Sequence, residues 1–162
     1  MRVGISPGTL AIVACTLAFA SHASAAPSTA SGSVALALAG VVAPYSPLPA
    51  TEKKAVAAFF NGDSNVPYAN KITVTADKIV CGASNVDITS RSCELTFAGH
   101  VSNVKGAAAN AIFATEALAG VPPDGAAGTI FEALSKLSCR LDPAMIKQKA
   151  GGGASCSFEP GN

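Results

Sequence analysis

Residues 71–82 read KITVTADKIVCG, and this stretch decides the fold class. Ile72, Val74 and Ala76 alternate with polar side chains as far as Asp77. A period of two is typical of a strand with one buried face and one solvated face. The pattern therefore predicts a strand that runs towards Cys81.

More strands are predicted directly after this one. Val86 and Ile88 occupy even positions, whereas Cys93, Leu95 and Phe97 occupy odd positions. The change of phase between Thr89 and Ser92 predicts a bulge, a bend or two separate strands. Residues 98–104 begin with AGH, which indicates a tight turn into another short strand.

Helices are predicted on both sides of this group of strands. The first begins at the N-cap candidate Thr51 and ends at Asn61-Gly62, and an alanine-rich helix covers residues 105–119. The next starts at Asp124 or Gly125, and its buried stripe comprises Ile130, Phe131, Leu134, Leu137 and Leu141. A helical turn over residues 142–149 and a strand at a sheet edge over residues 155–158 complete the chain. Because the strands are grouped, we predict an α+β fold, with a small, mostly antiparallel sheet packed by two to three helices.

Residues 1–25 have the features of a secretory signal peptide. Arg2 precedes an apolar run from about Thr9 to Ala20, and small residues flank Ser24. We expect cleavage after Ala25, because signal peptidase accepts small side chains at the two positions beside Ser24. The run is shorter than the ~20 residues that span a bilayer, so a permanent anchor is not predicted.

A lipoprotein signal is the alternative for the N-terminus. Residues 12–15 read IVAC and resemble a lipobox, in which the cysteine becomes the lipidated first residue. The apolar run continues through Ala20, where a lipoprotein signal usually becomes polar. In this alternative Cys15 would tie the protein to a membrane surface.

The domain is expected to follow a linker over residues 26–50. This segment is rich in Ala, Ser and Pro, and its prolines disfavour helix and central strand. The apolar patch Val34 to Val42 could add an edge strand or pack loosely. Residues 51–162 then form a single disulfide-stabilised domain.

Four cysteines remain beyond the leader, an even number that favours two disulfides in an exported chain. Sequence alone allows three connectivities. We favour the two local pairs, Cys81 with Cys93 and Cys139 with Cys156. The chain has no Cys-x-x-Cys motif, which argues against a thioredoxin-like site and a zinc ribbon.

Charge and residue types exclude several functions. The chain has 11 Lys and Arg against 10 Asp and Glu, and removal of Arg2 with the leader makes the two numbers equal. Nucleic-acid binding is therefore not expected. His100 is the one histidine beyond the leader, too few for a typical catalytic zinc site. No cofactor is expected, and the glycines of residues 151–153 indicate a connector rather than a phosphate-binding loop.

Carboxylates are the remaining candidates for chemistry. Asp77, Asp87 and Glu94 all fall among the predicted strands, and two of them could act as an acid and base pair. This alternative predicts a small carboxylate-dependent hydrolase.

The favoured hypothesis is a non-catalytic binding module, exported to the periplasm or secreted, whose partner is another envelope protein or a small ligand. A third hypothesis is a structural envelope component that assembles with copies of itself. Sequence alone does not identify the ligand.

Overall fold

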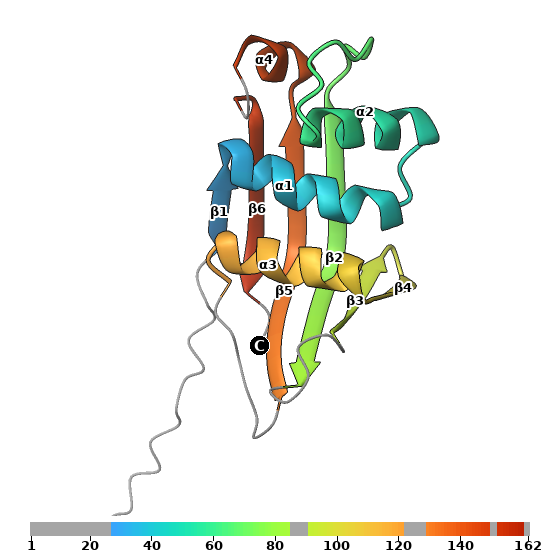
Figure 1. The fold of residues 1–162 in the computed structure, drawn as a ribbon, viewed down its shortest axis with the longest axis vertical. Helices are drawn as coiled ribbons and strands as arrows, with labels where there is room; N and C mark the ends of the chain where they lie inside the picture. Colours follow the sequence, from blue (N-terminus) through green and yellow to red (C-terminus); the bar gives the residue numbers. More distant parts are fainter. Residues whose placement is uncertain (1–26, 85–90, 122–128, 150–151, 161–162) are drawn as a thin grey trace, which may run out of the picture.

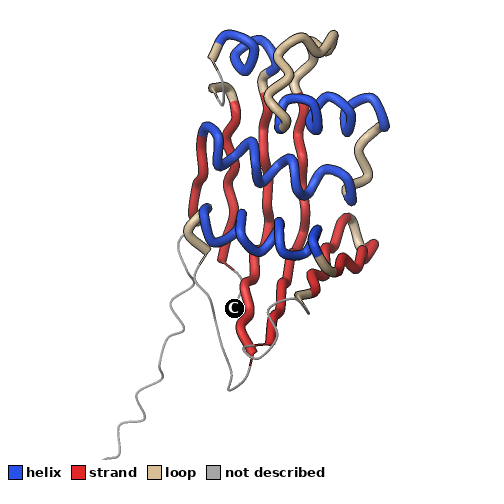
Figure 2. The backbone as a smooth tube through the Cα atoms, in the orientation of Figure 1, coloured by secondary structure: helices blue, strands red, loops and turns tan. Residues whose placement is uncertain are grey.

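The computed structural model describes residues 27–84, 91–121, 129–149 and 152–160. They form an α+β fold in which helices cover one face of a six-stranded antiparallel sheet (Figure 1 and Figure 2). The strands are β1 (Ser28–Ser31), β2 (Ile72–Ser84), β3 (Ser92–Phe97), β4 (His100–Lys105), β5 (Thr129–Leu141) and β6 (Ala154–Pro160). The helices are α1 (Gly32–Val42), α2 (Ala50–Phe60), α3 (Ala107–Leu118) and α4 (Pro143–Gln148), with a 3₁₀ helix η1 (Ala43–Tyr45) after α1. The predicted fold class is confirmed.

The strand order is β1-β6-β5-β2-β3-β4, so the two longest strands, β2 and β5, lie at the centre. Helices α1 and α3 cross the sheet, and α2 packs beside α1 (Figure 1). Along β2, buried Ile72, Val74 and Ala76 alternate with exposed Thr73 and Thr75. The core therefore lies between the sheet and the helices, and the opposite face of the sheet is open to solvent.

Both preferred disulfides are confirmed. Cys81 in β2 is bonded to Cys93 in β3, and Cys139 in β5 is bonded to Cys156 in β6. In each case the two residues are directly opposite each other in an antiparallel pair. Each bridge therefore ties two neighbouring strands together on the face that the helices cover.

The helix predicted from residue 124 to Leu141 is wrong for residues 129–141, which form the central strand β5. The helical spacing of Leu134 and Leu137 arises because β5 changes phase at Lys136, which has a φ of 51°. Beyond Lys136, Leu137, Cys139 and Leu141 are buried at alternate positions. Pairing with β2 along the whole strand outweighs the local preference for helix.

The linker expected over residues 26–50 is also wrong for residues 28–45, which form β1, α1 and η1. Strand β1 pairs with β6, and α1 lies over β6 and β5. Leu38 and Val42 of α1 are fully buried, at 0% exposure each. Alanine and leucine are strong helix formers, so this Ala-rich composition suits a buried helix as well as a linker. Val34 to Val42 thus joins the fold as a helix rather than an edge strand.

The ends of the other elements follow the predictions with small differences. Helix α2 begins at Ala50 after Pro49, so Thr51 is not its N-cap. Asp142 does cap α4, because its Oδ1 accepts hydrogen bonds from the backbone N–H groups of Ala144 and Met145. Strand β6 is not at the sheet edge, since β1 lies beyond it.

Several predictions fall outside the described residues. They are the leader over residues 1–25, the lipobox cysteine Cys15 and the part of the phase change that lies before residue 91. Among the residues that the structure does describe, no helix is long and apolar enough to cross a membrane.

Gly40 permits the close approach of α1 and α2, and we predict that Gly40→Ala destabilises the fold. A Cβ at Gly40 would lie 2.6 Å from Cγ and 2.9 Å from Cβ of Phe60. Overpacking costs about 1–3 kcal/mol, which exceeds the ~1 kcal/mol of helix propensity that alanine gains over glycine. We therefore expect the free energy of unfolding, measured with urea, to fall by about 1–2 kcal/mol.

The control is the same substitution in a Phe60→Gly background. Phe60 is 44% exposed, so truncation to glycine removes both contacting atoms without opening the deep core. In that background Gly40→Ala should become neutral or stabilising. Equal destabilisation in both backgrounds would contradict steric contact with Phe60 as the cause.

Candidate functional site

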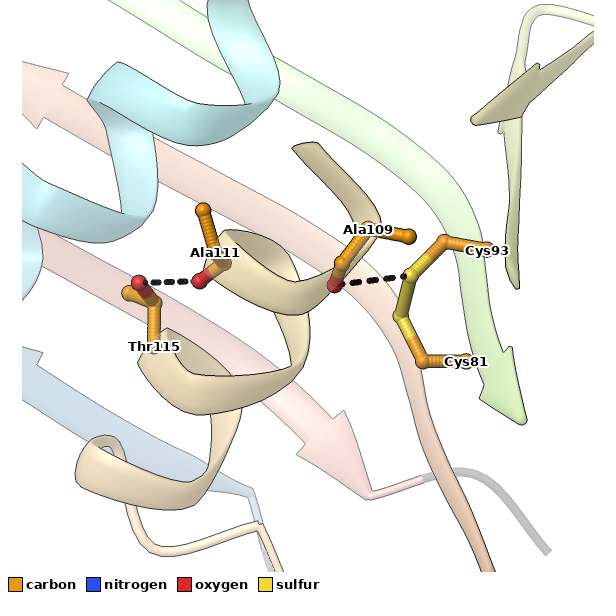
Figure 3. Close-up of a disulfide and its surroundings, with 5 residues drawn as sticks. All are labelled: Cys81, Cys93, Ala109, Ala111 and Thr115. Atoms are coloured by element: carbon orange, nitrogen blue, oxygen red, sulfur yellow. Dashed lines mark hydrogen bonds between the residues drawn. A yellow bond between two sulfur atoms is a disulfide. The ribbon is translucent and has the colours of Figure 1, made fainter. Parts of the chain in front are cut away.

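The four cysteines are structural rather than reactive. Cys81 is 0% exposed and Cys156 is 3% exposed, and their partners are buried as well. Sγ of Cys93 lies 3.6 Å from the carbonyl oxygen of Ala109 in α3 (Figure 3). Sγ of Cys156 lies 3.4 Å from the carbonyl oxygen of Ala35 in α1. Both bridges are therefore covered by helices and out of reach of a substrate.

The candidate carboxylates do not form a described pocket. Asp77 and Glu94 are both exposed. Glu94 is paired with Val80, three positions along β2 from Asp77, which corresponds to about 10 Å along the strand. Asp87 lies outside the described residues. Nothing in the described part of the chain brings Asp77 and Glu94 together for acid and base catalysis.

The histidine and the glycine-rich segment have simple structural positions. His100 is exposed and begins β4, directly after the tight turn at Ala98 and Gly99, both of which have positive φ. Gly153 links α4 to β6, and its carbonyl oxygen accepts a hydrogen bond from Asp142 N at 2.8 Å. Gly151 lies outside the described residues. Among the described residues, no group of three His, Cys, Asp or Glu side chains could hold a metal ion.

The open face of the sheet carries two regular rows of polar side chains. Cross-strand pairing places Thr29, Ser157, Ser138 and Thr75 in one row across β1, β6, β5 and β2. The next row on the same four strands consists of Ser31, Ser155, Arg140 and Thr73. We call these eight residues the hydroxyl face. Neighbours within a row are about 4.8 Å apart, and the two rows are about 6.7 Å apart, as in any sheet.

The hydroxyl face exists because its residues alternate with core residues. Ser155 and Ser157 flank the buried Cys156, and Ser138 and Arg140 flank the buried Cys139. The Cys139–Cys156 bridge and α1 fix the strands from the other side of the sheet. The polar rows are therefore displayed on a rigid support.

None of the eight side chains makes a hydrogen bond or ion pair with another described residue. Two neighbouring lysines have acidic partners, because Lys71 pairs with Asp142 at 3.4 Å and Lys136 pairs with Glu159 at 3.2 Å. Among the described residues, the Arg140 guanidinium therefore has no ion-pair partner, and the hydroxyl groups around it have no hydrogen-bond partner. Buried polar groups usually form hydrogen bonds with other groups of the protein. The polar groups of the hydroxyl face are instead available to solvent or to a ligand.

Two shallow hollows meet on this face. One, of about 480 Å³, is lined mainly by β1, β5 and β6 residues of the hydroxyl face. The other, of about 560 Å³, extends towards α4 and includes Thr73 and Met145. Arg140 and Ser155 line both hollows, so they occupy the junction.

A larger hollow of about 600 Å³ lies between α1, α2 and α4. Its apolar lining comes from Leu36, Phe59, Phe60 and Ile146. Two of its polar groups already serve the fold, because Lys147 Nζ donates to the carbonyl oxygen of Tyr68 and Asp63 Oδ1 accepts from Asn65 N. A specific ligand site needs polar groups that are free to orient the ligand. The hydroxyl face meets this requirement better.

A fourth hollow, of about 390 Å³, lies between α2 and the segment that follows it. Tyr68 Oη donates to Glu52 Oε1 at 3.1 Å. Desolvation and this hydrogen bond raise the pKa of Tyr68 above its ordinary value, because both favour the neutral phenol. The hydrogen bond ties the segment that contains Tyr68 to α2. Because the pKa of Tyr68 is raised, its phenol keeps its proton at neutral pH, which indicates a structural role.

The hydroxyl face was not predicted, although the sequence contains one signal for it. If Cys139 is bonded to Cys156 across paired antiparallel strands, counting outwards from the bridge aligns Ser138 with Ser157 and Arg140 with Ser155. This register is not apparent from the sequence, because the pattern of residues 129–141 predicts a helix and the composition of residues 28–31 predicts a linker.

Comparison with protein-family models, with curated proteins and with solved structures finds no match to this chain.

Proposed function

We propose that the protein is an exported, non-catalytic binding module that recognises its ligand with the hydroxyl face. The observation that carries this proposal is the set of eight polar side chains in two rows, none with a partner among the described residues. Hydroxyl groups both donate and accept hydrogen bonds, and a guanidinium donates in a fixed plane. Such a surface can match a ligand that has several polar groups at regular spacing.

Rigid support favours recognition of a ligand. A site that is already ordered loses little conformational entropy on binding. The central strands β2 and β5 carry Thr73, Thr75, Ser138 and Arg140. Helices α1 and α3 pack against the other face of these strands. The described part of this face contains no histidine, free thiol or paired carboxylate that could act on a bound ligand.

Export is supported by the leader and by the disulfides. Disulfides persist in oxidising compartments and are rare in the cytosol. Cleavage after Ala25 would release the chain just before β1, which begins at Ser28. The leader could therefore be removed without loss of any described strand or helix.

The test of export uses the full chain expressed in a Gram-negative host. The intact mass of protein from the periplasm should correspond to a chain that begins at Ala26, and an alkylating agent should find no free thiol in the denatured protein. A full-length chain in the cytosol with alkylated cysteines would overturn this part of the proposal.

The test of binding is a nuclear magnetic resonance titration of the purified, isotope-labelled protein. Separate polysaccharide, lipid and protein fractions of a bacterial envelope serve as probes. Binding should shift the amide signals of β2, β5 and β6 around Thr75, Ser138 and Ser157. Shifts confined to the hollow between α1, α2 and α4, or chemical turnover of a probe, would contradict the proposal.

A matched pair of variants locates the surface. Ser157→Arg places a bulky side chain in a row of the hydroxyl face, whereas Thr51→Arg makes the same kind of change at an exposed position of α2. Both variants should keep the melting temperature of the parent protein. Only Ser157→Arg should weaken binding, and equal weakening by both would count against the hydroxyl face.

A further inference from the structure

We infer that the ligand of the hydroxyl face is a carboxylate that also carries hydroxyl groups, such as a uronic acid unit of an acidic polysaccharide, with the carboxylate on Arg140. This inference rests on the proposed binding function and adds the chemical class of the ligand. It depends on three properties of the face: its charge, the pattern of its hydroxyl groups and its shape.

The charge of the face favours a ligand group with a single negative charge. The eight residues contain one cation, Arg140, and no acidic side chain. Two lysines near the face have acidic partners, since Lys71 is paired with Asp142 and Lys136 with Glu159. Exposed Asp77 and Lys78 follow Thr75 on β2 with opposite charges, so they add no net charge. A single carboxylate neutralises the Arg140 guanidinium, whereas a doubly charged phosphate group would keep a second negative charge for which the eight residues supply no cation. The planar fork of arginine also matches a carboxylate with two parallel hydrogen bonds.

The hydroxyl groups around Arg140 favour a ligand with its own hydroxyl groups. Ser155 is directly opposite Arg140 on β6, and Thr73 is directly opposite on β2. Ser138 and Ser157 follow in the next row. Each of these groups can donate and accept, so together they suit sugar hydroxyls, which also do both. A carboxylate without hydroxyl groups would leave most of these serine and threonine hydroxyls bound only to water.

The shape of the face favours a chain of units over a single enclosed molecule. Arg140 and Ser155 lie where the two hollows meet, so a ligand can extend in both directions from the cation. Both hollows are shallow and open, which means that one unit makes few contacts. The eight residues include no aromatic side chain on which a base could stack, which argues against a nucleic acid.

The experiment compares three probes by nuclear magnetic resonance titration of the intact protein. They are trigalacturonic acid, its fully methyl-esterified form, and acetate. We expect trigalacturonic acid to shift signals on β5 and β6 around Arg140 and Ser155. The neutral ester and acetate should bind about tenfold more weakly or worse, because the first lacks the charge and the second lacks the hydroxyls.

Variants distinguish the effect of the Arg140 guanidinium from the effect of the protein's overall charge. Arg140→Gln should weaken trigalacturonic acid binding about tenfold, and Arg140→Lys should keep part of the affinity because it retains the charge without the fork. Lys105→Gln removes an exposed cation from β4, away from the rows, and should have no effect. Thr73→Val should weaken trigalacturonic acid more than acetate. An unchanged melting temperature shows that each variant is folded.

The outcomes distinguish this inference from the proposed function. If Arg140→Gln binds trigalacturonic acid as well as the parent does, or if the ester binds equally, the carboxylate assignment is wrong. The proposed function survives that result if an envelope fraction still shifts the hydroxyl face. It fails if no fraction shifts this face.

Discussion

A chain that begins at Thr51 is expected to remain unfolded, whereas a chain that begins at Ala26 should unfold in one cooperative transition. The missing residues include β1 and α1, and α1 alone contributes Ala35, Leu38, Ala39 and Val42 to the core. Truncating one buried leucine to alanine costs about 2–5 kcal/mol. Loss of the whole helix together with β1 would therefore cost as much as the ~5–15 kcal/mol that stabilises a typical domain.

Circular dichroism and amide signal dispersion measure this result. The shorter chain should lack a near-ultraviolet signal and a cooperative thermal transition. Leu38→Ala in the longer chain is the graded control, and it should lower the free energy of unfolding by about 2–5 kcal/mol without abolishing the fold. A cooperative transition of the chain from Thr51 would show that α1 is dispensable and would contradict the prediction.

Loss of the Cys139–Cys156 bridge is expected to have the second largest effect. Closing a loop of this size in the unfolded chain contributes about 3 kcal/mol in the chain-entropy model. The paired substitution Cys139→Ala and Cys156→Ala should therefore lower the melting temperature by roughly 10–20 °C. The paired substitution of Cys81 and Cys93 should have a similar effect, because the sequence separations of 12 and 17 are close.

Reductant provides an independent check on both bridges. All four cysteines are buried, so dithiothreitol should leave the native protein oxidised at room temperature. In urea the same reagent should reduce both bridges, and the melting temperature of the refolded, reduced protein should fall below that of either double variant. Rapid reduction without denaturant would contradict the burial, and a melting temperature unaffected by loss of both bridges would contradict their stabilising role.

Local patterns predicted much of the fold. The alternation in residues 72–76 is strong because one face of β2 is buried and the other is solvated, and β3 and β6 also show it. The even number of cysteines and their short separations led to the observed pairing. These features depend on neighbours in sequence, so they can be recognised without the tertiary structure.

The errors arose where tertiary contacts determine the structure. Strand β5 changes phase at Lys136, and this places Leu134 and Leu137 at the spacing of a helix. Helix α1 has no charged residue, and its burial depends on β5, β6 and α3. Each segment is defined by partners that are distant in sequence, which a local pattern does not reveal.

The candidate site was missed for the same reason. Asp77, Asp87 and Glu94 were considered because carboxylates are chemically reactive, whereas serine and threonine in strands are usually only a solvated face. The rows of the hydroxyl face need four strands in register, and two of these, β1 and β5, were not predicted. Without them, Arg140 is a single cation with no defined surroundings.

The positions of the bridges have a mechanical consequence. One covalent link joins β2 to β3 and the other joins β5 to β6, so neither crosses from β2 to β5. The seam in the middle of the molecule is held by the ladder between these two long strands and by the packing above it. A force that draws β2 away from β5 would part the sheet along this seam into two stapled halves. Thr73 and Thr75 would then leave with one half and Ser138 and Arg140 with the other, so such a force would release whatever the face holds.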